Sequence, residues 1–298
     1  MPEVIVAKTA GFCFGVNRAL DMVCAELEKP GKVCTYGPIV HNETVTAELL
    51  SRGVTVLDSV DGAGAPIHEE IGNSGTDRSG DGGWSRTVVI RAHGVPEQVE
   101  NDLKDRGYNV VDATCPFVKK IHNIVRREND SGRRVIIVGD PDHPEVIGIA
   151  GRGDPENVVI ESFEDFKNLN LPLDKPYSLV AQTTFNYEKL SEIIDKLKVL
   201  QYDIRCFNTV CNATHERQRE AAEIAAKVDA MIVIGSRNSS NTRKLYEICK
   251  EKCDVTVLIQ DMDDLTCADF HSVNSVGITA GASTPKHIIE EVQTYVRS

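Results

Sequence analysis

Three cysteines, Cys13, Cys115 and Cys211, are the residues of this 298-residue sequence that are best suited to chemistry. Each one follows a short extended run and precedes apolar residues at helical spacing, so each is predicted to lie between a strand and a helix. Pro116 suits the first turn of such a helix, because a proline there loses no hydrogen bond. Backbone N–H groups at a helix start favour a thiolate. The near-equal separations put one such cysteine in each third of the chain.

Three thiolates from distant segments are typical of a metal centre. Zinc usually takes ligands that are paired at short spacing, and none of these three cysteines has such a partner. Cys206 is near Cys211, but it alternates as a strand residue does. Three thiolates without a fourth therefore indicate an iron–sulfur cluster with one iron open to substrate. The remaining cysteines are predicted to be structural: Cys24, Cys34, Cys206, Cys249, Cys253 and Cys267.

Polar side chains follow several of the other extended runs, and they suit an anionic ligand. Serine and asparagine at a strand-to-helix turn can bind phosphate oxygens together with backbone N–H groups, and histidines can do the same. In open parallel sheets such positions converge beyond the carboxyl ends of the strands. The predicted donors are His41, His93, His143, Ser239, Asn241 and Ser283. Glu145 is the candidate for proton transfer, because a carboxyl group in a dry cleft has a raised pKa.

Extended and helical segments alternate along the whole chain, which predicts an α/β fold with mostly parallel sheets. The repeated cysteine pattern indicates three similar α/β domains. We expect the first at residues 14–114, with a Gly/Ser/Asp-rich loop insertion at 61–86, the second at 115–210, and the third from 1–13 plus 211–298. The principal extended runs are at 4–7, 32–35, 87–90, 110–111, 135–138, 158–160, 178–181, 230–234, 255–258 and 275–279.

Composition and charge exclude several classes of protein. A net charge of −12 argues against broad nucleic-acid binding. The hydrophobic runs are too short to cross a membrane, and the first residues read as a strand rather than a secretory signal. Nine cysteines, without the tight spacing of a disulfide framework, predict a reducing cytoplasm.

A series of motifs along the chain resembles the 4-hydroxy-3-methylbut-2-enyl diphosphate reductases, the last enzymes of the non-mevalonate pathway of isoprenoid biosynthesis. Each motif alone has modest specificity, but their order over nearly the whole chain is highly specific. The motifs are Gly11-Phe-Cys13-Phe-Gly-Val16, Val40-His-Asn42, Ala92-His-Gly94, Asp112-Ala-Thr-Cys-Pro116, His143-Pro-Glu145, Gln182-Thr-Thr184, Gly235-Ser-Arg-Asn-Ser-Ser-Asn241 and Thr279-Ala-Gly-Ala-Ser283.

The resemblance implies a trefoil of three α/β domains around a central [4Fe-4S] cluster, with Cys13, Cys115 and Cys211 as ligands. It implies that an allylic diphosphate is reduced by two electrons, loses its hydroxyl as water, and gives isopentenyl or dimethylallyl diphosphate. Ferredoxin or flavodoxin would supply the electrons. Glu145, Thr183 and His143 would form the catalytic group, with Glu145 delivering protons. The implied diphosphate-binding set is His41, His93, His143, Ser239, Ser240, Asn241 and Ser283.

Some features depart from this family's pattern, and two other functions fit part of the sequence. Phe14 stands where alanine is common, Asp140 stands where histidine is common, and the loop at 61–86 is longer than usual. A metal-dependent phosphate-ester hydrolase would use the histidines and Glu145 but would leave the three cysteines idle. A non-enzymatic iron–sulfur electron carrier or sensor would use the cysteines but not the phosphate-type donors.

Overall fold

The computed structural model describes residues 2–60, 86–265 and 273–298. The predicted loop at 61–86 lies outside these residues apart from Arg86, where a strand begins, and Cys267 lies outside them too. Within the described ranges, no helix is both long enough and apolar enough to cross a membrane.

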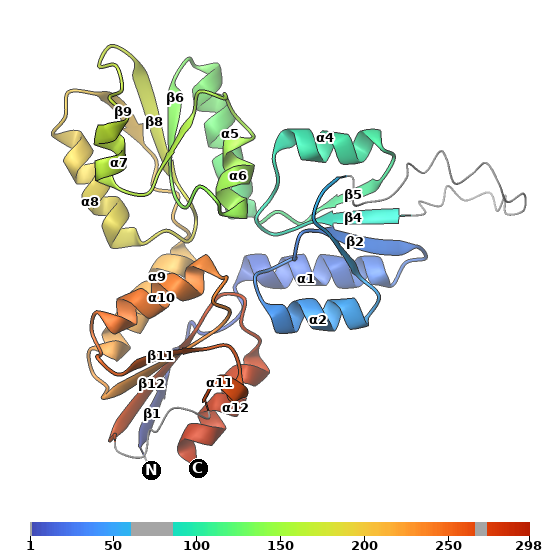
Figure 1. Ribbon diagram of the computed structural model, residues 1–298, viewed down its shortest axis with the longest axis vertical. Coiled ribbons are helices and arrows are strands. Elements are labelled where there is room, and N and C mark those ends of the chain that lie inside the picture. Colours follow the sequence, from blue (N-terminus) through green and yellow to red (C-terminus); the bar gives the residue numbers. More distant parts are fainter. Residues whose placement is uncertain (1, 61–85, 266–272) are drawn as a thin grey trace, which may run out of the picture.

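Three four-stranded sheets form three lobes around a common centre (Figure 1). All strand pairs in the described residues are parallel, so the predicted α/β class with parallel sheets is confirmed. The first sheet contains β2 (Lys32–Tyr36), β3 (Thr55–Leu57), β4 (Arg86–Ile90) and β5 (Asn109–Asp112). The second contains β6 (Arg134–Val138), β7 (Val158–Ile160), β8 (Pro176–Ala181) and β9 (Asp203–Cys206). The third contains β1 (Glu3–Val6), β10 (Ala230–Ile234), β11 (Thr256–Ile259) and β12 (Ser275–Ala280).

The three sheets share one strand order. It reads β3-β2-β4-β5 in the first sheet, β7-β6-β8-β9 in the second and β11-β10-β12-β1 in the third. The N-terminal strand β1 therefore fills the place that β5 and β9 fill in the other sheets, and both chain termini lie in the third lobe (Figure 1). The strands come from the residue ranges of the three expected domains, while the boundaries themselves stay a prediction.

Helices connect the parallel strands, as crossovers between parallel strands require. They cover both faces of the sheets, so the strands are nearly continuously apolar. In β10, for example, Ile232 and Ile234 pack on one side and Met231 and Val233 on the other. The helices are α1 (Phe14–Leu27), α2 (Glu43–Ser51), α4 (Glu97–Asp105), α5 (Pro116–Asp130), α6 (Pro144–Ala150), α7 (Phe163–Asn168), α8 (Tyr187–Lys198), α9 (Asn212–Ala225), α10 (Ser240–Lys250), α11 (Met262–Leu265) and α12 (Lys286–Arg297).

Each of the three candidate cysteines lies where the chain passes from one sheet to the next. Cys13 follows β1 of the third sheet, but helix α1 packs its Val16 and Val23 against the first sheet. Cys115 follows β5 of the first sheet and precedes α5, which packs on the second. Cys211 follows β9 of the second sheet and precedes α9, which packs on the third. This cyclic arrangement brings the three crossings to the centre of the molecule.

Polar contacts join the lobes close to that centre. Arg152, at the end of α6, donates from Nε to the carbonyl of Val95 at 3.0 Å and from Nη2 to Glu100 at 2.7 Å. Ser236 bonds Glu43 between the third and first lobes at 2.9 Å. These contacts fix the segment after β4 relative to the end of α6, and the start of α2 relative to the turn after β10.

Two arginines at the boundary of the first and second lobes give a matched test of this arrangement. We expect Arg152→Ala to lower the free energy of unfolding by about 1.5–3 kcal/mol, because hydrogen bonds to charged groups are lost and Glu100 keeps a largely buried charge. Arg126→Ala removes an exposed ion pair with Glu97 and should cost less than about 1 kcal/mol. Guanidinium unfolding of the apoprotein measures both values. Equal losses in the two variants would show that Arg152 does not tie the lobes together.

Candidate functional site

One central cavity is lined by every residue that the sequence analysis assigned to the site. Its walls come from all three lobes, so none of the lobes contains the site alone. The lining includes Cys13, Cys115, Cys211, His41, His93, His143, Glu145, Thr183, Ser239, Ser240, Asn241 and Ser283.

Helix N-termini position most of these side chains. Cys13, Cys115 and Cys211 are the N-cap residues of α1, α5 and α9, and none of them makes a side-chain capping hydrogen bond. The N–H groups in the first turns of α5 and α9 nevertheless face the sulfurs of Cys115 and Cys211, and they partly offset the rise in pKa that burial causes there. A second set of helices, α2, α6 and α10, begins at Asn42, His143 and Ser239. The N–H groups in the first turns of these helices favour negative charge in the cavity.

The cysteines lie close to one another, and Gly15 leaves the space for them. A Cβ atom at Gly15 would lie 2.6 Å from the sulfur of Cys115 and 3.9 Å from that of Cys13. Burial raises the pKa of the Cys115 thiol, and the negative charges of Cys13 and Cys211 raise it further. Burial also raises the pKa of Cys211. A cationic group that binds these sulfurs must therefore displace protons from them.

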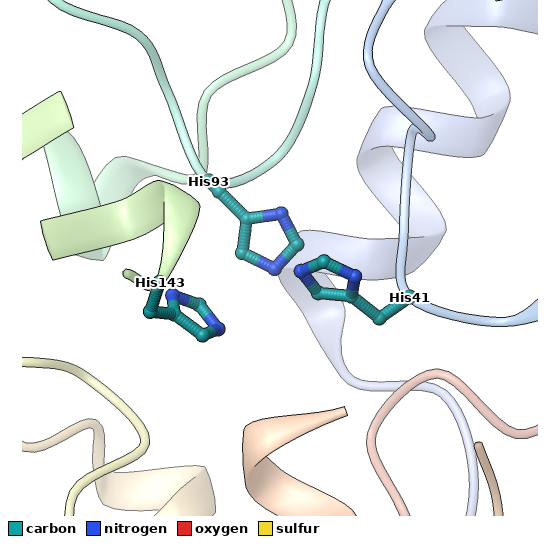
Figure 2. Close-up of side chains that lie close together, drawn as sticks. All are labelled: His41, His93 and His143. Carbon is teal, nitrogen blue, oxygen red and sulfur yellow. The ribbon is translucent and has the colours of Figure 1, made fainter. Parts of the chain in front are cut away.

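His41, His93 and His143 come from the first and second lobes, and their imidazole rings point toward one another (Figure 2). The ring centroids are 4.5 Å apart for His41 and His93, 5.5 Å for His41 and His143, and 5.3 Å for His93 and His143. Burial lowers the pKa of all three, and that of His143 falls to about 4. The three rings are consequently neutral at neutral pH.

The hydrogen bond of His143 shows which kind of ligand this trio suits. The ligand atoms of the three rings lie within 4.8 Å of one another, a spacing that alone would allow a metal ion. However, Nδ1 of His143 accepts the backbone N–H of Glu145 at 3.1 Å. The proton of the neutral ring is then on Nε2, which makes that atom a donor without a lone pair for a metal. This tautomer favours an anionic oxygen over a zinc ion.

Several buried polar atoms around the cavity make no hydrogen bond within the described part of the chain. They are Nε2 of His41, Nδ1 of His93 and both amide atoms of Asn241. Buried polar groups in proteins are nearly always paired, so a polar ligand is expected beside these atoms. The nearby hydroxyls are engaged: Ser283 bonds the carbonyl of His41 at 2.9 Å, and Ser240 bonds Thr184 at 3.1 Å.

Glu145 and Thr183 form a buried pair between the histidines and the cysteines. The carboxylate of Glu145 accepts the backbone N–H of Thr183 at 2.6 Å and its hydroxyl at 2.7 Å. Burial raises the pKa of Glu145 to about 7, although both hydrogen bonds lower it. The carbonyl of Thr183 in turn accepts the N–H of Cys211 at 3.0 Å. One peptide segment thus connects the acidic group with the third cysteine.

The cavity also contains Arg217, which the sequence analysis did not assign to the site. Arg217 lies one helical turn before Ala221, on the buried face of α9. A charged residue on a predicted apolar face was the signal that could have identified it. The guanidinium is 3% exposed and donates to the carbonyl of Ala280 at 2.6 Å.

The other cysteines and the departures from the family pattern lie away from the cysteine trio. Cys249 and Cys253 are buried free thiols, as predicted. The prediction that Cys206 fills space in the core is wrong, because its position near the end of an outer strand leaves it exposed. Phe14 is 64% exposed, so its ring is not packed among the sulfurs. Asp140 pairs with Arg243 at 3.3 Å, which links the second and third lobes near His143.

Comparisons with known proteins agree with this arrangement. The sequence model of the family described as LytB protein matches residues 4–297. The 4-hydroxy-3-methylbut-2-enyl diphosphate reductase of Clostridioides difficile is 40% identical over 297 residues, which is 99% of each chain. That of Geobacter sulfurreducens is 43% identical over 290 residues, 97% of this chain and 95% of the relative.

Two solved structures extend the agreement to the fold. The E-1-hydroxy-2-methyl-but-2-enyl-4-diphosphate reductase from Plasmodium falciparum superposes with a TM-score of 0.89 at 28% identity, over 100% of this chain and 88% of the other. An (E)-4-hydroxy-3-methyl-but-2-enyl diphosphate reductase, described as the terminal enzyme of the non-mevalonate pathway, gives a TM-score of 0.65 at 37% identity, covering 100% and 99%. The family expected from the sequence motifs is thus confirmed: the chain belongs to the LytB protein family, to which 4-hydroxy-3-methylbut-2-enyl diphosphate reductases of similar sequence and fold correspond.

Proposed function

We propose that this protein is a 4-hydroxy-3-methylbut-2-enyl diphosphate reductase, an oxidoreductase of isoprenoid biosynthesis. The substrate takes up two electrons and two protons, its allylic C–O bond breaks, and water leaves together with isopentenyl or dimethylallyl diphosphate. One observation carries the proposal. Three helix-capping cysteines, a buried carboxyl group of raised pKa and a set of anion donors line a single cavity.

Cys13, Cys115 and Cys211 would hold a [4Fe-4S] cluster. When bound, such a cluster supplies electrons one at a time and presents one iron without a protein ligand. The residues around the sulfurs fit this group, because Gly15 has no side chain in a place where a Cβ would meet the sulfur of Cys115. The thiols of the described cysteines are free, which supports a reducing, cytoplasmic location.

The diphosphate would bind at the opposite set of helix starts. His41, His93 and His143 each offer a neutral ring N–H, while Ser239, Ser240, Asn241 and Ser283 complete the set with the N-termini of α2, α6 and α10. The unpartnered Nδ2 of Asn241 would donate a hydrogen bond to a phosphate oxygen. Neutral donors and backbone N–H groups let a protein of net charge −12 bind an anion.

Glu145 is the proposed proton source, and Thr183 is the proposed link to the substrate hydroxyl. A pKa of about 7 keeps roughly half of the carboxyl groups protonated at neutral pH. The Thr183 hydroxyl, 2.7 Å from Glu145, can pass that proton to the leaving oxygen. The same carboxyl group can then protonate the carbon skeleton, after it has regained a proton. Ferredoxin or flavodoxin is the proposed electron donor.

The structure gives the two alternatives less support. A zinc-type hydrolase would need lone pairs on all three histidines, but the hydrogen bond of His143 puts a proton on its free nitrogen. An electron carrier would not need the orphaned amide of Asn241 or the buried Glu145–Thr183 pair.

A first prediction concerns proton delivery. Glu145→Gln should keep the cluster and diphosphate affinity but lower kcat by about 10²–10⁴-fold, because the amide cannot transfer a proton. Anaerobic single-turnover assays and a direct binding measurement separate these two properties. Unchanged turnover would remove Glu145 from the mechanism, and loss of diphosphate binding would give it a different role.

A second prediction concerns the stability of the apoprotein. The native protein retains the Glu145 proton between about pH 4.5 and about pH 7, whereas the unfolded chain releases it, so stability falls as pH rises through this window. The expected loss is about 1.4 kcal/mol per pH unit for this one group. The Gln variant lacks this contribution but retains those of the histidines. Wild type should therefore lose about 2 kcal/mol more than the variant between pH 5 and 7. Parallel curves in urea unfolding would contradict the raised pKa.

A third prediction concerns the cluster site. Gly15→Ala should change the stability of the apoprotein little, because the higher helix propensity of alanine, worth roughly 0.5–1 kcal/mol over glycine, offsets the cost of moving the Cys115 side chain away from the new Cβ. It should nevertheless lower iron and sulfide content, since the new Cβ crowds the sulfur of Cys115.

Cys115→Ser should abolish loading, and Cys206→Ser, at an exposed thiol, is the control that should load normally. Iron and sulfide analysis after anaerobic reconstitution measures all three variants. Full loading of the Cys115 variant would refute the ligand assignment.

A further inference from the structure

Arg217 is a buried positive charge in the wall of the central cavity. Its side chain is 3% exposed, and its hydrogen bond goes to the neutral carbonyl of Ala280 at 2.6 Å. Among the described residues it forms no ion pair with a carboxylate. Glu220, one turn further along α9, instead accepts the N–H groups of Lys8 and Thr9 and the Thr9 hydroxyl.

This arrangement is unfavourable unless an anion joins it. A guanidinium group stays protonated in proteins, so Arg217 cannot become neutral to escape the cost of burial. A buried ion without a counter-charge is strongly destabilising. The fold nevertheless keeps this group in the wall of the central cavity.

The position of Arg217 identifies the negative charge that it faces. Burial lowers the pKa of Arg217, and the negative charges of Cys13, Glu220 and Cys211 oppose this decrease, so two sulfurs of the trio are close enough to interact with the guanidinium. Ala280, which fixes the guanidinium, ends β12, and the carbonyl of Ala282 two residues later accepts the N–H of Cys13 at 3.2 Å. Arg217 and Cys13 are therefore held by the same segment.

We propose that Arg217 is the internal counter-ion of the three-cysteine centre and that it raises the reduction potential of that centre. The inference rests on the proposed function, since it needs a cluster at Cys13, Cys115 and Cys211. Each ligating thiolate adds one negative charge, and each electron received from the external donor adds another. A fixed positive charge nearby stabilises the reduced form more than the oxidised form.

Two substitutions separate the charge of Arg217 from its hydrogen bond. Arg217→Gln removes the charge, whereas Arg217→Lys keeps a charge but loses the planar guanidinium. Arg219→Gln is the matched control, because Arg219 lies on the same helix with a side chain 67% exposed. Reconstituted proteins would be titrated anaerobically with dithionite and redox mediators, with the cluster followed by electron paramagnetic resonance. Thermal unfolding would be recorded for the apoproteins.

If Arg217 acts through its charge, removing that charge should have opposite effects on the apoprotein and on the reconstituted protein. Apo Arg217→Gln should unfold at the same temperature as wild type or higher, because an unpaired buried charge is gone. In the reconstituted Gln variant the equilibrium constant for reduction should fall at least tenfold, a potential lower by about 59 mV for one electron. Arg217→Lys should retain most of the wild-type potential, and Arg219→Gln should match wild type.

Other results would overturn the inference. A wild-type potential in the loaded Gln variant would show that the charge does not act on the centre, as would an equal decrease in the Gln and Lys variants. A lower apo unfolding temperature in the Gln variant would mean that Arg217 serves the fold through Ala280. If the Gln variant does not fold, the Lys variant still tests the proposal. A tenfold decrease in its equilibrium constant for reduction would contradict the proposal. Failure of wild type to take up iron and sulfide would instead refute the proposed function. The unfolding temperatures of the apoproteins would still test whether Arg217 is an unpaired buried charge.

Discussion

The site depends on one constraint: six helices begin at the same cavity, so their unpaired backbone N–H groups all favour negative charge there. Parallel sheets impose this constraint, because every helix that follows a strand starts at the same edge of its sheet. The chain can therefore be acidic overall, with a net charge of −12, and still provide an environment for an anion. Two helix sets divide the cavity. Cysteines cap α1, α5 and α9, while Asn42, His143 and Ser239 cap α2, α6 and α10.

The two sets communicate through one buried peptide. Thr183 bonds Glu145 with its N–H and hydroxyl, and its carbonyl accepts the N–H of Cys211. Glu145 itself stands two residues after His143, whose ring it fixes through its own N–H. The His-Pro-Glu order thus has a local explanation. Histidine caps α6, proline suits the first helical position, and the carboxyl group leaves the first turn toward Thr183. The proposed proton source, anion donor and metal-binding side are therefore joined by hydrogen bonds.

Much of this was predictable from sequence, and the failures have physical causes. The positions of Cys13 and Cys115 between strand and helix are local properties, so short-range patterns revealed them. Strand β3 (Thr55–Leu57) was missed because it is short and begins with polar Thr55, whereas the equally short β7 (Val158–Ile160) is entirely apolar and was predicted. Arg217 was missed because its importance lies in a three-dimensional property: the side chain is buried, and among the described residues it forms no ion pair with a carboxylate. The tautomer of His143 also depends on a three-dimensional contact. The sequence thus predicts where polar groups lie, whereas their charge states require the fold.

The pairing of β1 with β12 has a consequence for the way the protein is made. Residues 3–6 leave the ribosome long before their partner, residues 275–278. At roughly 5–20 residues per second, β1 waits about 15–55 s for that partner. Cys13 follows β1, and its N–H is held by the carbonyl of Ala282, so the sulfur of Cys13 reaches its place only after Ala282 has been synthesised. An incomplete chain can form the first two sheets without assembling the three-cysteine site. The proposed metal centre could therefore form only after the third sheet has been synthesised, and iron and sulfide would have to be delivered after that point.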